Sequence, residues 1–218
     1  YGAAILAVLS VVIAGTRLLY IGVPPTDDSA TFAVIGHELL AGRELYSDLW
    51  EQRPPAIFLL FAFAEYIVGY GDLQLYTLGV TGSILGAIAI YFATSSPPWT
   101  WKTGIWAAVF WTILNIGPFM EVYDPRCETF INVCLVTAVG ILLRSRKATI
   151  EWGRTIAAGI CFALASLLKH PAVLTVIPII VAYCAACYWH IGGRGKRLRH
   201  AIVEVVGLGA IGFVVWAA

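Results

Sequence analysis

Long apolar stretches separated by short polar connections dominate the chain. The apolar stretches are residues 2–23, 74–94, 103–120, 127–143, 155–168, 171–190 and 201–218. A bilayer core about 30 Å thick needs about 20 apolar residues per helix, within a range of roughly 17–25. We therefore expect each stretch to form a transmembrane helix. The stretch 155–168 is short for this role, and the tripeptide Lys169-His170-Pro171 separates it from the next one.

Residues 24–73 differ from these stretches because polar side chains interrupt them. Within this segment, residues 29–41 carry apolar side chains at helical spacing and stop before Gly42, a residue type that often ends helices. The apolar positions are Phe32, Ile35, Leu39 and Leu40. This pattern predicts an amphipathic helix that lies on the membrane surface.

A second helix is predicted over residues 54–70, because the segment begins with two prolines, a helix-start signal. The segment is apolar except for its polar tyrosine hydroxyls and Glu65, so it either spans the membrane or lies at the interface. Its hydrophobicity alone does not decide between these two arrangements.

The distribution of charges favours the interfacial arrangement of residues 54–70. Nine of the fourteen basic residues follow the second, fourth and sixth apolar stretches: Lys102, Arg144, Arg146, Lys147, Arg154, Arg194, Lys196, Arg197 and Arg199. Eight of the thirteen acids lie in residues 24–73: Asp27, Asp28, Glu38, Glu44, Asp48, Glu51, Glu65 and Asp72. Lys and Arg in short loops favour the cytoplasmic side. An interfacial 54–70 puts these basic loops on that side and the acids on the opposite, extracytoplasmic face.

Composition supports a polytopic membrane protein of the all-α class. Hydrophobic residues make up 60% of the 218 positions and charged residues 12%, whereas soluble domains average about 45–50% and about 25%. These values exclude an ordinary soluble enzyme, a disordered chain and a basic nucleic-acid-binding domain. The chain opens on Tyr1 and closes within an apolar stretch, so we expect it to be the N-terminal portion of a larger membrane protein.

Three positions in residues 24–73 are candidates for chemistry. Asp27 and Asp28 follow the first apolar stretch at the membrane boundary, where partial desolvation can tune a carboxylate as a general base. Asp28 is alternatively the N-cap of the helix after it. Arg53 precedes the two prolines, and a guanidinium at headgroup depth suits a phosphate. The alternative for Arg53 is ordinary snorkelling to the interface.

Further candidates lie near the ends of later apolar stretches. Lys169 stands between two apolar helices, where an unpaired ammonium costs on the order of 2.5–3.5 kcal/mol at a helix centre. That cost favours an anionic partner, although a lysine at a helix end also reaches the headgroups. Three acids surround the start of the fourth stretch: Glu121, Asp124 and Glu128. No His, Cys and Asp cluster has the spacing of a metal site.

The order of these features resembles the GT-C superfamily of integral-membrane glycosyltransferases, and its protein O-mannosyltransferase and aminoarabinose-transferase branch most closely. A carboxylate pair directly follows the first expected transmembrane helix, and the pattern G-x-x-x-Y-x-D-x-W-x-x-x-P-P follows the pair. The matching residues are Gly42, Tyr46, Asp48, Trp50, Pro54 and Pro55. The resemblance covers nearly all of this chain and about the first half of such an enzyme. The pair is Asp-Asp where Asp-Glu is commoner, which leaves the sugar open.

The resemblance implies an inverting transfer of a sugar from a polyprenyl-phosphate donor to a protein, lipid or glycan acceptor on the extracytoplasmic face. The implied roles are catalysis by Asp27 and Asp28, donor-phosphate binding by Arg53 and Lys169, and orientation of the acceptor or of a cation by Glu128, Glu121 and Asp124. A divalent cation is the one cofactor left open. Two other hypotheses remain: an inactive GT-C-like subunit of a larger membrane complex, and a secondary transporter.

Overall fold

The computed structural model describes residues 1–96, 99–116, 124–144, 151–190, 203 and 206–209. Regular structure in these residues is helical, without a β-strand, and one isolated bridge joins Leu45 and Leu49. The predicted all-α class is therefore confirmed. The helices are α1 (Gly2–Leu18), α2 (Asp27–Leu40), α3 (Ala56–Val68), α4 (Asp72–Thr94), α5 (Trp101–Ile116), α6 (Cys127–Arg144), α7 (Trp152–Leu168) and α8 (Ala172–His190).

Most helices occupy the stretches predicted from hydrophobicity, with boundaries that differ by a few residues. α1 ends at Leu18, five residues early, because the chain continues in tight turns, with Tyr20 N–H donating to the Arg17 carbonyl. α2 begins at Asp27 rather than at residue 29. The predicted helix 201–218 lies mostly outside the described residues.

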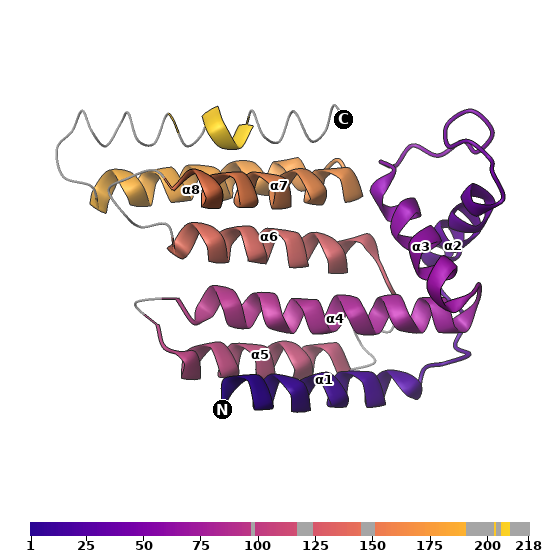
Figure 1. Cartoon of the computed structure of the whole chain (residues 1–218), viewed down its shortest axis with the longest axis horizontal. Helices are drawn as coiled ribbons and strands as arrows, with labels where there is room; N and C mark the ends of the chain where they lie inside the picture. Colours follow the sequence, from indigo (N-terminus) through magenta and orange to yellow (C-terminus); the bar gives the residue numbers. More distant parts are fainter. Residues whose placement is uncertain (97–98, 117–123, 145–150, 191–202, 204–205, 210–218) are drawn as a thin grey trace.

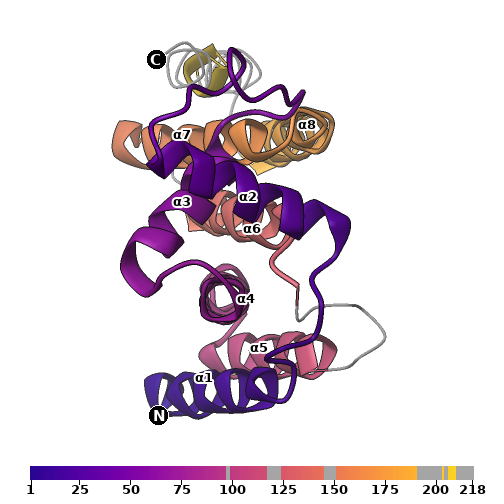
Figure 2. The same ribbon diagram turned by 90° about the vertical axis from the view of Figure 1, so that its right-hand side faces the viewer.

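The helices α1, α4, α5, α6, α7 and α8 run roughly along one direction, and α2 and α3 pack together across one end of them (Figures 1 and 2). α4 contacts α1, α5 and α6, and α6 contacts α7 and α8. α3 contacts α4 and α7, but it lies across the end of the long helices and not alongside them (Figure 1). The end of α1 and the starts of α4 and α6 all reach the end covered by α2 and α3 (Figure 1).

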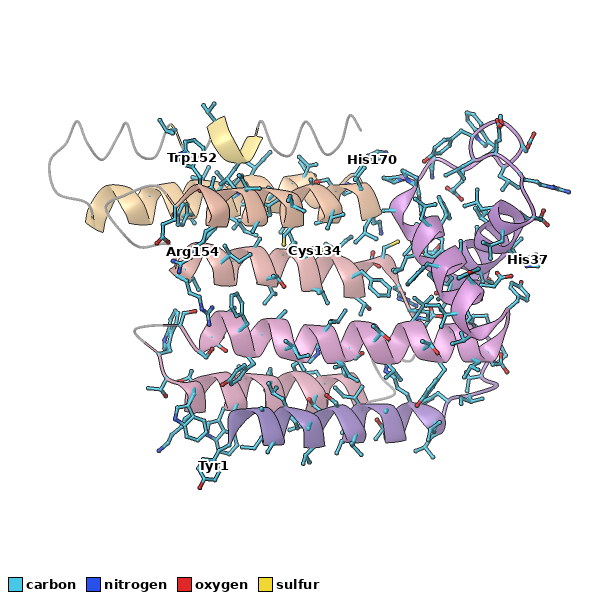
Figure 3. All side chains as sticks on the ribbon, viewed as in Figure 1. Tyr1, His37, Cys134, Trp152, Arg154 and His170 are labelled. Atoms are coloured by element: carbon cyan, nitrogen blue, oxygen red, sulfur yellow. The ribbon has the colours of Figure 1, made fainter. Side chains whose placement is uncertain are left out.

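Side chains near the two ends of α7 lie at opposite ends of the bundle. His170, just after α7, lies at the end near α2 and α3, whereas Trp152 and Arg154 lie near the other end (Figure 3). Arg154 forms an ion pair with Glu151 and donates to the Arg144 carbonyl at 2.5 Å. Many of the predicted cytoplasmic basic residues, including Arg146 and Lys147, lie outside the described residues.

Among the described helices, α4 and α6 are long and apolar enough to cross a membrane. Residues 172–183 of α8 and the helices α1, α3 and α7 are apolar but shorter. Large apolar side chains also point outward along the bundle: Val8, Val11, Trp106, Phe110, Leu174, Ile177 and Val181. Exposing apolar area to water costs a free energy of about 25 cal/mol per Å².

An aromatic cluster joins α2 to α3. The Phe32 ring on α2 packs edge-on against Phe58 and Phe61 of α3, with centroid distances of 5.8 Å and 5.5 Å, and all three side chains are fully buried. Gly36 allows the two helices to approach closely, because a Cβ there would lie 2.8 Å from the Ala62 backbone nitrogen. This contact fixes α3, and the residues just before it, relative to the start of α2.

Candidate functional site

Arg53 and Asp28 form the first ion pair of the candidate site. Arg53 Nη2 donates to Asp28 Oδ1 at 2.8 Å, and the guanidinium carbon lies 4.8 Å from the centre of the Phe32 ring. Burial lowers the pKa of Arg53, but the hydrogen bond and charge of Asp28 outweigh that effect and leave the pKa raised. A cation stacked on an aromatic ring and held by a carboxylate has a restricted position.

The loop between α2 and α3 shows how the residues from Gly42 to Pro55 position Arg53. Gly42 takes a φ of 89°, which favours glycine and ends α2. The Asp48 carboxylate accepts a hydrogen bond from the Glu44 backbone N–H at 3.0 Å. Tyr46, at a φ of 71°, donates its hydroxyl to the Arg53 carbonyl at 2.8 Å. These residues therefore act as a scaffold for the arginine.

Lys169 and Glu128 form the second ion pair. Lys169 follows the last residue of α7, and its Nζ donates to Glu128 Oε1 at 2.5 Å. Glu128 lies in the first turn of α6, where the helix dipole favours an acid. The hydrogen bond to Glu128 raises the pKa of Lys169, so this ammonium is charged at neutral pH. The anionic partner predicted for Lys169 is thus a carboxylate of the chain itself.

Both pairs lie around the buried side chain of Cys127. Four charges act electrostatically on its thiol: those of Glu128, Arg53, Lys169 and Asp28. The charge of Arg53 also acts on Lys169. The structure therefore brings together four of the predicted site residues, from α2, α6 and the segments before α3 and after α7.

Asp27 lies beside this group without joining either pair. Its side chain is exposed, and within the described part of the chain its carboxylate has no hydrogen bond or ion pair, although its carbonyl accepts from Thr31. Successive helical residues point about 100° apart, so Asp28 turns toward Arg53 and leaves Asp27 open. The alternative of Asp28 as the N-cap is wrong, because Thr26 occupies that position.

Two other predicted residues are not part of the pairs. The Asp124 side chain is buried. Its Oδ2 accepts a hydrogen bond from the Thr26 hydroxyl and lies 3.5 Å from Arg126 Nε. It ties the segment before α2 to the segment before α6. Glu121 lies outside the described residues.

The structure contains two polar features that the sequence patterns do not single out. His37 Nδ1 lies 2.6 Å from Glu65 Oε1 and links α2 to α3. That hydrogen bond raises the pKa of His37. Arg17 is buried within α1 despite its charge. Of these two features, only Arg17 could have been noticed in the sequence, because it is an isolated charge within an apolar stretch.

The described residues contain no group of three or more His, Cys, Asp and Glu side chains suited to a metal ion. Of the acids expected to orient a cation, Glu128 pairs with Lys169 and Asp124 with Arg126, and Glu121 lies outside the described residues. The described members of this donor set do not fit a divalent cation.

No family model, no curated protein and no solved structure matches the chain.

Proposed function

We propose that this chain is the front part of a polytopic membrane glycosyltransferase that uses a polyprenyl-phosphate-linked sugar. The observation that carries the proposal is that two carboxylate–cation pairs, Asp28–Arg53 and Glu128–Lys169, both lie close enough to Cys127 to act on its thiol electrostatically. The unpaired carboxylate of Asp27 lies next to the first pair in the chain. Two cations suit a phosphate, and a free carboxylate suits a general base.

The surface of the bundle supports the proposed membrane setting. α4 and α6 are long enough to span, and apolar side chains on the other helices face outward. The helices α1, α5, α7 and α8 run beside them and complete a bundle within one bilayer. α2 and α3 then lie at the interface, with the candidate site on the extracytoplasmic side, as the positive-inside rule predicts.

The proposed reaction is a single inverting displacement. The acceptor hydroxyl oxygen attacks the anomeric carbon, Asp27 takes the hydroxyl proton, and the bond from that carbon to the phosphate oxygen breaks. The leaving phosphate keeps the electron pair and so gains negative charge. Arg53 and Lys169 stabilise that charge. A phosphate that binds both cations competes with Asp28 and Glu128 for them.

Substitution of Asp27 tests the base assignment. Asp27→Asn keeps the shape of the side chain and removes its basicity, so transfer should fall by about 10²–10⁴-fold while donor affinity stays unchanged. The measurement is transfer of radiolabelled sugar from a polyprenyl-phosphate donor, using the full-length protein in detergent or liposomes.

Glu38→Gln is the matched control, because Glu38 lies on the same helix and pairs with Arg43 on the exposed surface. It should retain full transfer. Full transfer by the Asp27→Asn variant would eliminate Asp27 as the base. Proton-driven uptake of a solute, without any sugar transfer, would instead favour the secondary transporter.

A further inference from the structure

A cavity lies between α2 and the start of α4, and none of the four paired residues of the proposed glycosyltransferase site lines it. Its volume is about 160 Å³, which is roughly ten or more times the 10–15 Å³ that a single water needs. On the side of α2 its wall consists of the apolar side chains of Ala30, Ala33 and Val34, and Leu75 of α4 adds to it. Two of these side chains are alanines, so the space stays open and can hold a group of several heavy atoms.

The three-residue link from α3 to α4 forms another part of the wall. Gly69 and Gly71 have φ values of 87° and 119°, a region that favours glycine, and this conformation lets the chain pass directly from α3 into α4. Tyr70, between the two glycines, is exposed and lines the cavity. Its ring packs against the His37 ring, with the centroids 4.9 Å apart. The cavity therefore has one aromatic ring, held in place from outside.

Among the described residues that line the cavity, Asp72 is the one with a charged side chain. Asp72 is exposed, and within the described part of the chain its carboxylate has no hydrogen bond or ion pair. It is the first residue of α4, where the helix dipole contributes about half of a positive charge. A full carboxylate charge outweighs that contribution. The cavity is therefore mainly apolar, with a net negative charge on one side.

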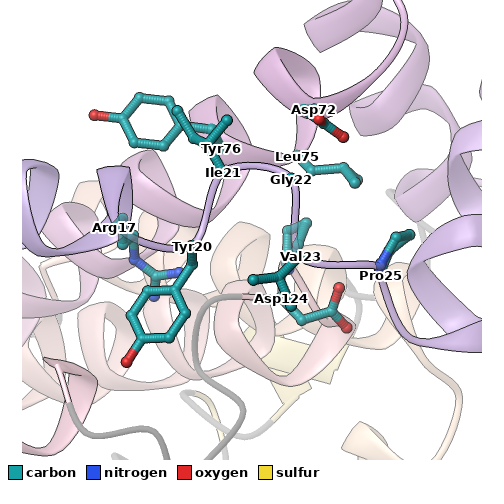
Figure 4. A pocket seen from close by; sticks show the side chains of 11 residues that line it. Arg17, Tyr20, Ile21, Gly22, Val23, Pro25, Asp72, Leu75, Tyr76 and Asp124 are labelled. Carbon is teal, nitrogen blue, oxygen red and sulfur yellow. The ribbon is translucent and has the colours of Figure 1, made fainter.

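Neighbouring cations do not neutralise Asp72. Asp72 also lines a smaller cavity of about 30 Å³ together with Arg17, but the two side chains lie on opposite sides of the link between α1 and α2 (Figure 4). The carboxylate that attracts Arg17 electrostatically is Asp124. On the other side, His37 forms a hydrogen bond with Glu65, which balances its charge when it is protonated. The negative charge of Asp72 is thus open to a cation from outside the chain.

We propose that this cavity binds a primary ammonium group attached to a short apolar chain. The ammonium donates N–H hydrogen bonds to the Asp72 carboxylate and lies against the Tyr70 ring, whose face attracts cations. The apolar chain covers the alanines of α2, which removes apolar area from water. This site is separate from the proposed reaction, so sugar transfer does not depend on it.

The lining residues select this ligand over three others. No basic side chain lines the cavity, so an anion meets only repulsion from Asp72. A neutral alcohol of the same size leaves the carboxylate charge unmatched. A quaternary ammonium has no N–H to donate, and the proteins that bind one surround it with several aromatic rings. A soluble amine and the ethanolamine headgroup of a lipid both carry the proposed group.

The test is the thermal unfolding midpoint of the full protein in detergent with butylammonium, butanol or butyrate. These three compounds share an apolar chain and differ in the charge of the head group. Equal ionic strength in all samples keeps screening the same. At about ten times the dissociation constant, butylammonium should raise the midpoint by about 3–6 °C. Butanol and butyrate should leave it unchanged.

Two variants remove the site in different ways. Asp72→Asn removes the charge, and Ala30→Leu fills the space but keeps the charge, so each should abolish the effect of butylammonium. Glu38→Gln is the control, because it removes an exposed acid that pairs with Arg43, and it should retain the effect. Saturation-transfer NMR on the unmodified protein does not depend on any variant folding. It should detect bound butylammonium and no bound butyrate.

Bilayers of defined composition distinguish the two sources of the ammonium group. Loss of the butylammonium signal in phosphatidylethanolamine bilayers, but not in phosphatidylcholine bilayers, supports a lipid headgroup as the ligand. Equal signals in both bilayers support a soluble amine. The proposal is overturned if butanol or butyrate stabilises the protein as much as butylammonium does, if the effect survives both Asp72→Asn and Ala30→Leu, or if the unmodified protein gives no NMR signal for butylammonium in detergent.

Discussion

The crossing of α2 and α3 at Gly36 controls how Asp28 and Arg53 meet. A methyl group added at Gly36 would lie 2.8 Å from the Ala62 backbone nitrogen and 3.2 Å from the carbonyl carbon of Phe61. Backbone atoms cannot rotate away from such a contact, so the two helices must separate by a few tenths of an ångström. Gly36→Ala should therefore destabilise the protein and loosen the Asp28–Arg53 pair.

Two opposing terms set the size of this effect. Overpacking a buried position costs about 1–3 kcal/mol. Replacing glycine by alanine inside a helix returns about 1 kcal/mol. Because the clash is with the backbone, its cost lies in the upper part of that range, and the net loss is about 1–2 kcal/mol. For a chain of this length, such a loss lowers the unfolding midpoint by about 2–8 °C.

Gly15→Ala is the matched control, because Gly15 is an exposed residue of α1 with nothing within 4 Å of an added Cβ. It should stabilise the protein by about 0.5–1 kcal/mol. The assay is thermal unfolding of both variants in the same detergent, followed by circular dichroism. The reasoning is refuted if Gly36→Ala is as stable as the unmodified protein, or if both variants shift the midpoint in the same direction.

Two further predictions concern the same helix pair and its loop. The hydrogen bond to Glu65 raises the pKa of His37 above 6.5, so the pair stabilises the fold fully below that pH and less as pH rises through the raised pKa. His37→Gln should therefore lower the unfolding midpoint more at about pH 6 than at about pH 9, and equal losses would contradict this. Tyr46→Phe removes the hydrogen bond to the Arg53 carbonyl and should weaken donor binding about 2–10-fold. Titration of the donor checks this, and Tyr66→Phe, at an exposed position of α3, should have no effect.

The length of the apolar stretches was sufficient to predict the helices of the described bundle. The apolar stretches are long and the connections contain Pro, Gly or charged residues, so helix formation there depends on local sequence. The early end of α1 was not predicted, because the apolar residues that follow Leu18 form turns and not a helix. Apolar composition alone cannot distinguish these two conformations.

The candidate site was only partly predictable, for a different reason. The sequence identified Arg53, Lys169 and Glu128, but not that Lys169 would pair with Glu128, which lies 41 positions away in the chain. That pairing depends on how α6 and α7 pack. Likewise, Asp124 looked like a site residue by its position, whereas packing buries it against Thr26.

In the proposed reaction, Arg53 and Lys169 together bind the phosphate of a polyprenyl-linked sugar. The most direct measurement is the affinity of the purified full-length protein for such a donor, compared with Arg53→Gln, Lys169→Gln and the control Lys102→Gln. A charged hydrogen bond contributes about 1.5–3 kcal/mol, so each of the first two variants should bind about 10–100-fold more weakly. Lys102 lies at the opposite end of the bundle, at the start of α5, and its variant should bind normally. Unchanged affinity in both the Arg53 and the Lys169 variants would contradict the account.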